Sequence, residues 1–402
     1  MILLGCILIS EAELTARYDV DGDGMPWPDD CDDRDASVTH CVSVEPPPDW
    51  REGEGDYGHD VALLVGGHVL VGAPSEAEAH VDERLLRGPS SCASGGDGAG
   101  WSVAAVGDLD GDGAGEALVG GPSLGAGGGC AGAAWLLPSA AWTDDVSLAE
   151  GGGTVTGEAA GDGLGFAVAG VDLDGDGLDE ILLGAPVAGA VYAISAAELG
   201  AGANIAAKSG AVWTAAGAGF GVRSGGDVDG DGRGDVLVTT DAGLVVLGGA
   251  LDEVLATVPG VGGCGPRCAS ALGDLDDDGR SELAVGDSAN LYLLPGAALS
   301  GTVEATDVAT SVLLGTAIYA VAPGDDGALL GEASGVFLVT DPPLGAIDLA
   351  DGVAREYATE APGSDFGWAI DGGVDLGLGA SGPDVAVGSP GEGRVYFFAG
   401  RN

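Results

Sequence analysis

The stretch Asp172-Leu-Asp174-Gly-Asp176-Gly-Leu-Asp-Glu180 runs directly into the apolar segment Ile-Leu-Leu-Gly-Ala-Pro186, and the chain repeats this pattern. Every copy carries acids at positions 1, 3, 5 and 9 and Gly at position 6. Alternating carboxylates of this kind surround a hard cation the size of Ca²⁺, and the Gly permits the sharp turn between them. We therefore expect Ca²⁺ in four loops, held by Asp108, Asp110, Asp112 and Glu116; by Asp172, Asp174, Asp176 and Glu180; by Asp227, Asp229, Asp231 and Asp235; and by Asp274, Asp276, Asp278 and Glu282.

These four segments, called the Asp loops below, differ from EF-hands. An EF-hand needs its last carboxylate at position 12 and a helix on each side. Position 12 is apolar in all four loops, where it is Val119, Leu183, Val238 or Val285. Short apolar runs that end at Gly or Pro indicate buried strands. Each loop is therefore predicted to join two strands.

A repeat of roughly 50 residues begins near residue 55. The Asp loops start 64, 55 and 47 residues apart. An aromatic residue beside Gly stands shortly before most of the loops, and a Gly-Ala-Pro tripeptide or a variant follows several loops. The units start near residues 57, 101, 165, 219, 267, 317 and 366. This period, with three or four short strands per unit, predicts an all-β protein with a seven-bladed β-propeller.

The recurring elements are the aromatic–Gly pair (as in Phe366-Gly367), the Asp loop, and Gly184-Ala-Pro186. Together they resemble the FG-GAP repeat of integrin α-subunit head domains, which is also common in bacterial surface proteins, over about residues 55–400. The resemblance implies a seven-bladed propeller with Ca²⁺ in loops on one face. It also implies adhesion or ligand capture on the propeller face.

The units depart from this pattern in several places. The first, sixth and seventh lack the triple Asp, so no metal is assigned to them. The fifth lacks the Phe-Gly pair, and whether the sixth is a full blade is left open. The last unit stops after Arg394-Val-Tyr-Phe-Phe-Ala399, which has the character of a third strand. We expect a strand near Cys41–Val44 to supply the fourth, closing the ring and hiding its edge.

The first 54 residues form two further segments. Residues 1–16 are a short apolar leader in which Leu3-Leu4-Gly5-Cys6 resembles a bacterial lipobox, although the usual basic region is missing. Lipid on Cys6 is one interpretation, and a hydrophobic leader remnant is the other. Residues 17–54 hold an acidic cluster and a Pro-rich spacer. The cluster is similar to thrombospondin type 3 calcium motifs and predicts a small Ca²⁺ module, with a disordered linker as the alternative; its ligands would be Asp19, Asp21, Asp23 and Asp30.

The cysteines other than Cys6 fall into sequence-near pairs, 31–41, 92–130 and 264–268. This arrangement fits disulfides formed in an oxidising compartment. No segment is long and apolar enough to be a transmembrane helix. The sequence therefore favours a protein that is secreted or lies on the outer surface of a bacterial cell envelope.

The composition excludes some classes of partner. The chain has 64 acidic and 13 basic residues, which give a net charge of −51. Such a surface repels nucleic acid and anionic membranes, so we exclude both as partners. No His, Ser or Cys stands in a recognised catalytic motif, so we expect no enzyme activity. Trp101 and Trp368 open their units and are expected to pack in blade cores.

These features lead to a calcium-binding β-propeller at residues 55–402. We expect a non-enzymatic adhesion or ligand-binding module whose partner is an unidentified protein or glycan. One alternative is a carbohydrate-binding protein, or a hydrolase or lyase, with its site over the central channel. A structural component of the cell envelope is the other.

Overall fold

The structure is a computed structural model, and it describes most of the chain from residue 49 onward. The described residues are 2–4, 7–9, 49–89, 98–123, 130–198, 203–205, 210–261, 267–287, 290–314, 318–324, 327–332, 335–340, 345–348, 355–357, 365–374, 376 and 384–398. The predicted acidic calcium module and Cys6 lie outside these ranges. Every predicted cysteine pair also has at least one member outside them.

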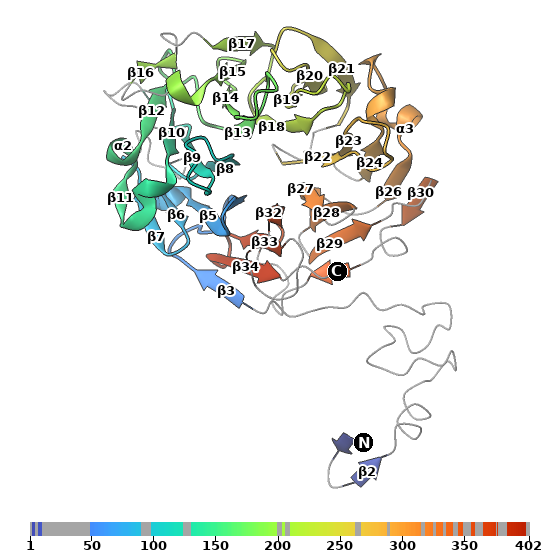
Figure 1. Ribbon diagram of the computed structural model, residues 1–402. Coiled ribbons are helices and arrows are strands. Elements are labelled where there is room, and N and C mark those ends of the chain that lie inside the picture. Colours follow the sequence, from blue (N-terminus) through green and yellow to red (C-terminus); the bar gives the residue numbers. More distant parts are fainter. Residues whose placement is uncertain are drawn as a thin grey trace.

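Beyond a short antiparallel pair of β1 (Ile2–Leu4) and β2 (Ile7–Ile9), the described strands form seven sheets of four or five strands. The sheets stand around a central axis as the blades of a β-propeller, as Figure 1 shows. This confirms the predicted all-β propeller architecture.

The first three sheets contain two of the four outer fifth strands described below. The first is β4 (Val61–Leu64), β5 (His68–Ala73), β6 (Glu78–Val81), β7 (Arg84–Arg87) and β11 (Val146–Ser147). The second is β8 (Ser102–Val106), β9 (Glu116–Gly121), β10 (Ala133–Leu137), β12 (Gly153–Thr156) and β16 (Ala203–Asn204). The third is β13 (Val168–Val171), β14 (Glu180–Ala185), β15 (Ala190–Ile194) and β17 (Ala211–Thr214).

The remaining sheets follow in chain order. The fourth is β18 (Gly221–Gly226), β19 (Asp235–Thr240), β20 (Gly243–Leu247), β21 (Val254–Pro259) and β25 (Gly301–Thr302). The fifth is β22 (Ala269–Gly273), β23 (Glu282–Gly286), β24 (Asn290–Leu294), β26 (Ser311–Leu314) and β30 (Gly345–Asp348). The sixth is β27 (Ile318–Gly324), β28 (Gly327–Glu332), β29 (Gly335–Thr340) and β31 (Arg355–Tyr357), and the seventh is β32 (Ala369–Val374), β33 (Asp384–Ser389), β34 (Arg394–Phe398) and β3 (Asp49–Glu52).

The first four strands of each sheet pair antiparallel from the axis outward. The second strand is the most deeply buried, as in β14, where the five residues after Glu180 are all buried. Both faces of this strand pack against neighbouring sheets, which explains its continuous apolar sequence. Four sheets gain a short parallel fifth strand (β11, β16, β25 or β30) from a segment that follows in the next unit.

Glycines of the Gly-Ala-Pro motif set how closely neighbouring sheets approach. A Cβ on Gly120 of β9 would lie 3.1 Å from the carbonyl carbon of Gly165 and closer still to its oxygen. Gly72, Gly184, Gly331 and Gly388 make the same close approach to a Gly of the next sheet around the ring. Any side chain at these positions would force the two sheets apart. The motif is therefore a packing device between blades.

The seventh sheet joins the two ends of the propeller. β3 pairs antiparallel with β34, with Trp50 opposite Tyr396. A strand that precedes the first unit therefore closes the ring, as predicted, but the predicted position of that strand was wrong. The closing strand is Asp49–Glu52, and residues 41–44 lie outside the described part of the chain. Arg51 adds an ion pair with Asp82 at 3.1 Å and stacks over the Phe397 ring.

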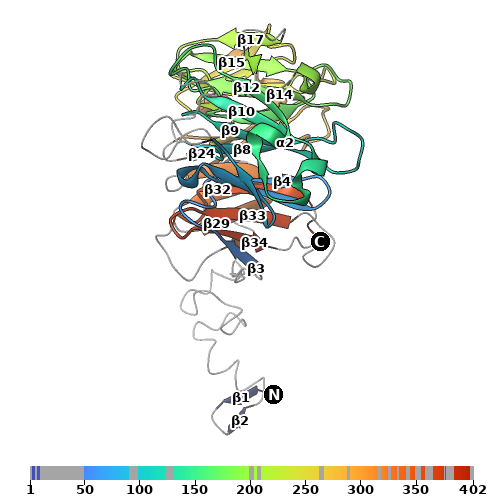
Figure 2. The same cartoon turned by 90° about the vertical axis from the view of Figure 1, so that its left-hand side faces the viewer.

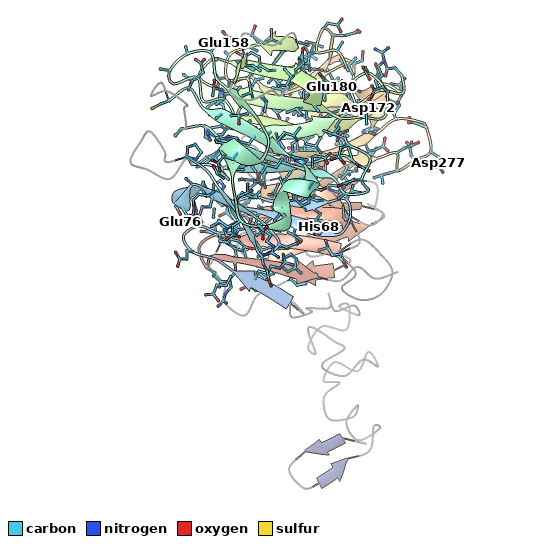
Figure 3. All side chains as sticks on the ribbon, turned by 60° about the vertical axis from the view of Figure 1, so that its left-hand side comes forward. His68, Glu76, Glu158, Asp172, Glu180 and Asp277 are labelled. Carbon is cyan, nitrogen blue, oxygen red and sulfur yellow. The ribbon has the colours of Figure 1, made fainter. Side chains whose placement is uncertain are left out.

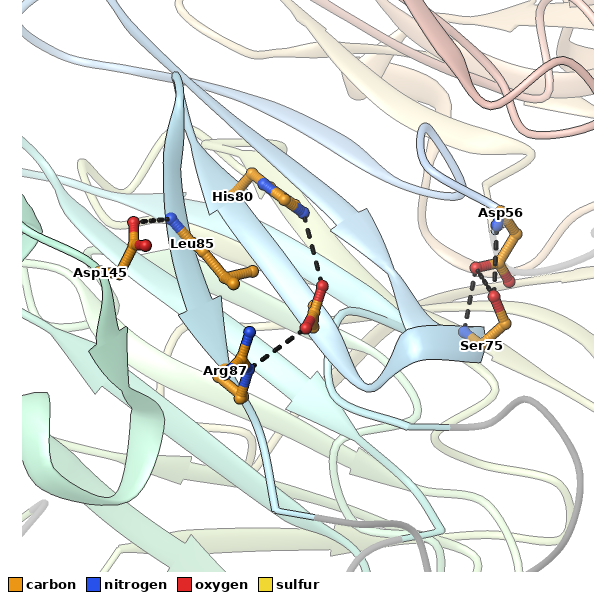
Figure 4. Close-up of polar contacts among 7 residues, drawn as sticks. Asp56, Ser75, His80, Leu85, Arg87 and Asp145 are labelled. Carbon is orange, nitrogen blue, oxygen red and sulfur yellow. Dashed lines mark hydrogen bonds and ion pairs between the residues drawn. The ribbon is translucent and has the colours of Figure 1, made fainter. Parts of the chain in front are cut away.

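The outer edge of the first sheet is tied to the second unit. Asp145 Oδ1 accepts a hydrogen bond from Leu85 N at 3.1 Å, beside the parallel pairing of β11 with β7 (Figure 4). Nearby, Glu78 contacts Arg87 at 3.3 Å and His80 at 4.0 Å. The pairing with β11 thus covers the edge strand β7 of the first sheet.

Helices are short and peripheral in the described residues. They are 3-10 turns at Pro74–Glu76, Ser139–Thr143, Ala196–Glu198 and Gly296–Ala298, and the single-turn helices α2 (Leu148–Gly151) and α3 (Ala305–Val308). No helix among the described residues has the length and apolar character needed to cross a membrane.

Candidate metal centres

The Asp loops occupy the same place in four successive sheets. Each connects the innermost strand to the second one, between β8 and β9, β13 and β14, β18 and β19, or β22 and β23. The ninth residue of every loop is also the first residue of the second strand. The buried strand therefore fixes the ninth carboxylate, while the rest of the loop extends into solvent.

The first Asp of each loop shapes the backbone. Asp172 Oδ1 accepts hydrogen bonds from Gly175 N at 2.7 Å and Asp176 N at 3.1 Å, and Oδ2 accepts one from Gly177 N at 2.9 Å. Asp108 and Asp227 repeat all three bonds, and Asp274 repeats the last two. These bonds curl the loop around the carboxylates at positions 1 and 3.

Two residues per loop have a left-handed backbone. The sixth-position glycines have φ between 85° and 94°, which confirms the predicted sharp turn. Position 4 is also left-handed, and in the fourth loop a non-glycine residue, Asp277, adopts it with φ 61°. Asp tolerates this conformation better than most residues do. Substitution of Gly by Asp at position 4 is therefore compatible with the same loop.

The ninth-position acids turn back into their own loops. Glu116 Oε2 accepts a hydrogen bond from Leu109 N at 2.6 Å, and Glu282 Oε2 accepts one from Leu275 N at 2.7 Å. The same bond is 3.0 Å long at Glu180 and 2.8 Å long at Asp235. One oxygen of each acid thus holds the loop, and the other is left for a ligand.

The structure brings the predicted ligands together. One carboxylate oxygen from each of Asp108, Asp110, Asp112 and Glu116 lies within 4.8 Å of the others. In the other loops the acids at positions 1, 3 and 9 converge in this way, but Asp176, Asp231 and Asp278 stand outside the cluster. Each of these three accepts a hydrogen bond from the backbone N–H two residues later. The sequence pattern alone did not separate position 5 from the other ligand positions.

These carboxylates lack counter-charges. None of the ion pairs among the described residues includes an Asp-loop acid. Burial, reinforced by neighbouring acids of the same loop, raises the pKa of Glu116 and Glu180, and it raises the pKa of Asp235 to about 7. Glu116 Oε1 is also buried without a hydrogen-bond partner. Oxygen-only ligands around an unpaired buried carboxylate fit a hard divalent cation such as Ca²⁺.

The Asp loops contact one another around the ring. Gly234 N of the third loop donates to Asp172 O of the second at 2.7 Å, and Ser281 N of the fourth donates to Asp227 O at 2.6 Å. Gly107 N donates to Asp179 Oδ2 of the second loop at 2.9 Å. Position 8 of one loop is therefore bonded to the start of the preceding loop. The four candidate centres form one continuous band.

The seventh sheet keeps part of the same arrangement. Asp384, fully buried at the start of β33, accepts a hydrogen bond from Leu376 N at 2.6 Å. Asp384 begins the second strand of its sheet, as the ninth-position acids of the Asp loops do. No cluster of metal-binding acids accompanies it in the described residues. Asp384 thus accepts the same kind of backbone hydrogen bond as the ninth-position acids of the Asp loops. Asp19, Asp21, Asp23 and Asp30 lie outside the described residues, so they stay a prediction.

A second set of residues lies at the other end of the inner strands. A glycine with positive φ precedes most of them, as at Gly165 and Gly219. The side chains that follow form a collar around the axis, in chain order His59, Trp101, Phe166, Phe220, Arg267, Tyr319 and Trp368. Ring centroids of His59 and Trp101 are 4.6 Å apart, and those of Trp101 and Phe166 are 5.3 Å apart.

The collar corrects two interpretations of the sequence. Trp101 and Trp368 both line a cavity on the axis; Trp101 joins no blade core, whereas Trp368 also packs against the core between the seventh and first sheets, as expected. Phe366 is not their equivalent; it is 1% exposed and packs in a core with Tyr396 and Phe398. Both positions lie beside Gly in the sequence, so a pattern of aromatic and Gly does not distinguish them. The residue after the glycine faces the axis, and the one before it faces the core.

The collar and the Asp loops lie on opposite faces of the ring. A collar residue stands just before each inner strand, and an Asp loop stands just after it in four sheets. Neighbouring inner strands contact each other. Collar residues contact collar residues at one end of these strands, and Asp loops bond to Asp loops at the other end. The inner strands therefore all run in the same direction. Figure 3 shows Asp172 and Asp277 toward one side of the ring and Glu76 toward the other, and Figure 2 shows the ring from its edge.

Comparison with known proteins gives one result at family level. No curated protein matches the chain. The sequence profile of the FG-GAP repeat family matches residues 164–214, which comprise the whole of the third sheet and its Asp loop. Residues 164–214 therefore carry an FG-GAP repeat, within a chain that folds as a β-propeller.

Proposed function

We propose that the protein is a Ca²⁺-stabilised, seven-bladed propeller that works outside the cytoplasm as a non-enzymatic binding module. All seven sheets serve as blades in this proposal. Its Asp loops hold Ca²⁺ on one face and leave the opposite face for a protein or glycan. The proposal extends to the whole chain what the family match gives for residues 164–214.

The observation that carries the proposal is the convergence of acids in four equivalent loops. Three or four carboxylate oxygens approach within 4.8 Å of one another in each loop, and no cationic side chain in the described part of the chain forms an ion pair with them. Like charges at this distance destabilise the folded state unless a cation neutralises them. Ca²⁺ accepts six to eight oxygen ligands, which the loop carboxylates, a backbone carbonyl at position 7 and water would provide.

Bound Ca²⁺ would supply charge neutralisation and would fix the turn between two strands. Because hydrogen bonds join successive Asp loops, order imposed on one loop is passed to its neighbour. The metal would thus stabilise one rim of the ring. This role requires no reaction at the metal, which is why we propose binding in place of catalysis.

The test is thermal unfolding of the full-length protein with 2 mM Ca²⁺, with 2 mM Mg²⁺ and with chelator. Extracellular calcium modules bind with dissociation constants of about 10⁻⁴–10⁻³ M. At roughly 2 mM free Ca²⁺ each site then stabilises the fold by about 0.6–1.8 kcal/mol. We expect a clear rise in melting temperature with Ca²⁺ and a smaller one with Mg²⁺.

The fourth Asp loop offers a matched pair of variants. Asp276→Asn removes a carboxylate of the convergent cluster, whereas Asp277→Asn removes the adjacent charge, which lies outside the cluster. Asn tolerates the left-handed backbone of residue 277. We expect Asp276→Asn to reduce the effect of Ca²⁺ and Asp277→Asn to preserve it. Equal behaviour of the two variants would show that Ca²⁺ acts only through the general acidity of the surface.

The proposed location follows from the metal. Sites in this range of affinity fill at millimolar Ca²⁺ and stay largely empty at cytosolic concentrations. We therefore propose a secreted or cell-surface protein. A lipid tether at Cys6 and disulfides between sequence-near cysteines remain part of this proposal.

A further inference from the structure

The cavity on the propeller axis, about 640 Å³ in volume, is a second candidate site, distinct from the Asp loops. Its wall consists mainly of Ala, Gly, Ser and Val of the inner strands. Five side chains that carry or could carry charge also line it: His59, Asp60, Arg223, Arg267 and Asp371. A volume of this size matches that of typical small-molecule sites.

The acids in the cavity already have partners. Asp60 accepts hydrogen bonds from Val103 N at 2.8 Å and from Arg267 Nε at 3.1 Å. Asp371 accepts hydrogen bonds from Leu63 N at 2.7 Å and from Gly372 N at 2.9 Å. Burial lowers the pKa of His59 to about 4, so this ring is neutral at pH 7. Asp60 and Arg267 therefore neutralise each other, and backbone N–H groups hold Asp371.

Arg223 differs from these residues. Arg223 lines the cavity and makes no hydrogen bond or ion pair among the described residues, although the carboxylates of Asp60 and Asp371 interact with its charge from farther away. It remains charged at any pH at which the protein is folded. Only 13 of the 402 residues are basic, yet two of them line this cavity. A planar guanidinium with unused donors is well suited to pair with a carboxylate through two hydrogen bonds.

The collar lies at one end of the cavity, away from Arg223. Arg223 lies three residues beyond Phe220 along the chain, which is about 10 Å further into the channel. Trp101, Phe166 and Trp368 of the collar line the cavity and offer ring faces for stacking. The site therefore has a largely aromatic entrance, where Arg267 is paired with Asp60, and the further positive charge of Arg223 below it.

We propose that the central cavity binds a small organic monocarboxylate whose carboxylate pairs with Arg223 and whose ring-shaped body lies within the aromatic collar. A single unused guanidinium flanked by Asp60 and Asp371 favours one negative charge over the two of a phosphate ester. This inference names the class of ligand that the proposed binding module would take, and it rests on the proposed function. The cavity extends from the collar along the inner strands to Gly226, Gly273 and Ser281, which lie beside the third and fourth Asp loops.

The experiment is a titration of the full-length protein with paired probes, followed by calorimetry and tryptophan fluorescence. Phenylacetate is compared with 2-phenylethanol, and D-glucuronate with D-glucose, in roughly 0.15 M salt, where charges beyond about 8 Å are screened. We expect one carboxylate to bind at least about tenfold more tightly than its neutral partner, with a fluorescence change from Trp101 and Trp368. The two pairs distinguish an aromatic from a sugar body.

Two variants assign the effect to Arg223. Arg223→Gln should abolish the preference for the carboxylate, whereas Arg84→Gln removes one exposed positive charge elsewhere and should leave it unchanged. Melting temperatures of both variants verify that they fold. If Arg223→Gln does not fold, the wild-type comparison still decides: equal affinity for a carboxylate and its neutral partner overturns the proposal. Unchanged preference in a folded Arg223→Gln variant overturns it as well.

Failure of this inference can be distinguished from failure of the calcium proposal. Each titration is repeated with saturating Ca²⁺ and with chelator. Carboxylate binding without any calcium effect on melting would refute the calcium proposal and leave this one standing. A calcium-dependent melting temperature with no preference for carboxylates would do the reverse.

Discussion

The close approach of Gly120 to the neighbouring sheet gives the sharpest prediction about stability. In Gly120→Ala the new Cβ would lie 3.1 Å from the carbonyl carbon of Gly165 and nearer to its oxygen, inside the distance that real Cβ atoms keep. Both atoms belong to backbone fixed by hydrogen bonds, since Gly165 N donates to Gly184 O at 3.0 Å. The second and third sheets would have to separate, because neither side can yield through a side-chain rotation.

The expected cost follows from this geometry. Overpacking by one methyl group in a fixed environment destabilises proteins by about 1–3 kcal/mol, and a backbone contact belongs in the upper half of that range. A loss of about 2 kcal/mol corresponds to a fall in melting temperature of about 4–8 °C for a large domain. Gly184→Ala makes the equivalent contact with Gly219 of the fourth sheet and should behave in the same way.

The assay is thermal and urea unfolding with Gly248→Ala as the control. A Cβ at Gly248 would meet its nearest neighbour, Leu255 Cδ2, at an ordinary 3.6 Å. That variant should change stability by no more than about 0.5 kcal/mol, or stabilise slightly by restricting the unfolded chain. If Gly120→Ala unfolds at the same temperature as Gly248→Ala, the Gly-Ala-Pro glycine is not required for blade packing.

Three further predictions concern closure, charge and the metal. Removing residues 1–52 deletes β3 and exposes the edge of β34, so the truncated protein should melt at least several degrees lower than the full chain and aggregate more readily; equal melting would show that β3 does not close the ring. Burial raises the pKa of Asp371 to about 6, so its contribution to stability is fully present below about pH 4 and is lost as the pH rises through about 6. Asp60 and Arg223 are the charged groups facing Asp371. Asp371→Asn should therefore flatten the dependence of stability on pH between about pH 4 and 7, an effect of at most about 3 kcal/mol. An unchanged slope would contradict the raised pKa of Asp371. Glu116→Gln should lower the number of bound Ca²⁺ ions by one while leaving the fold intact, as measured by calorimetry and circular dichroism, and an unchanged number would exclude Glu116 as a ligand.

Local features explain why much of the fold could be predicted. The Asp loops combine turn chemistry with ligand spacing, and Asp172 indeed curls its own loop through three hydrogen bonds. The apolar run after Glu180 is short and ends at Gly-Ala-Pro, so it indicated a buried strand, and β14 is one. These inferences depend on neighbours within about ten residues, which the sequence displays directly.

The errors concern contacts between distant segments. Trp101 and Phe366 both lie beside Gly, and only the ring decides that one faces the axis and the other a core. The closing strand was placed at residues 41–44 because any short β-forming segment before the first unit could have paired with β34. Arg223 carries no motif, and its importance appears only when the inner strands place it in the cavity.

Direct counting of bound Ca²⁺ on the full-length protein tests the central claim most directly. Isothermal titration of chelator-treated protein, verified by equilibrium dialysis, should give about four ions in the Asp loops, plus any that the acidic N-terminal segment binds. Asn substitutions at Asp108, Asp172, Asp227 and Asp274 should each remove one ion. Absence of saturable Ca²⁺ binding up to about 10 mM, an order of magnitude above the weakest extracellular modules, would contradict the account and leave the Asp loops as turns on an acidic surface.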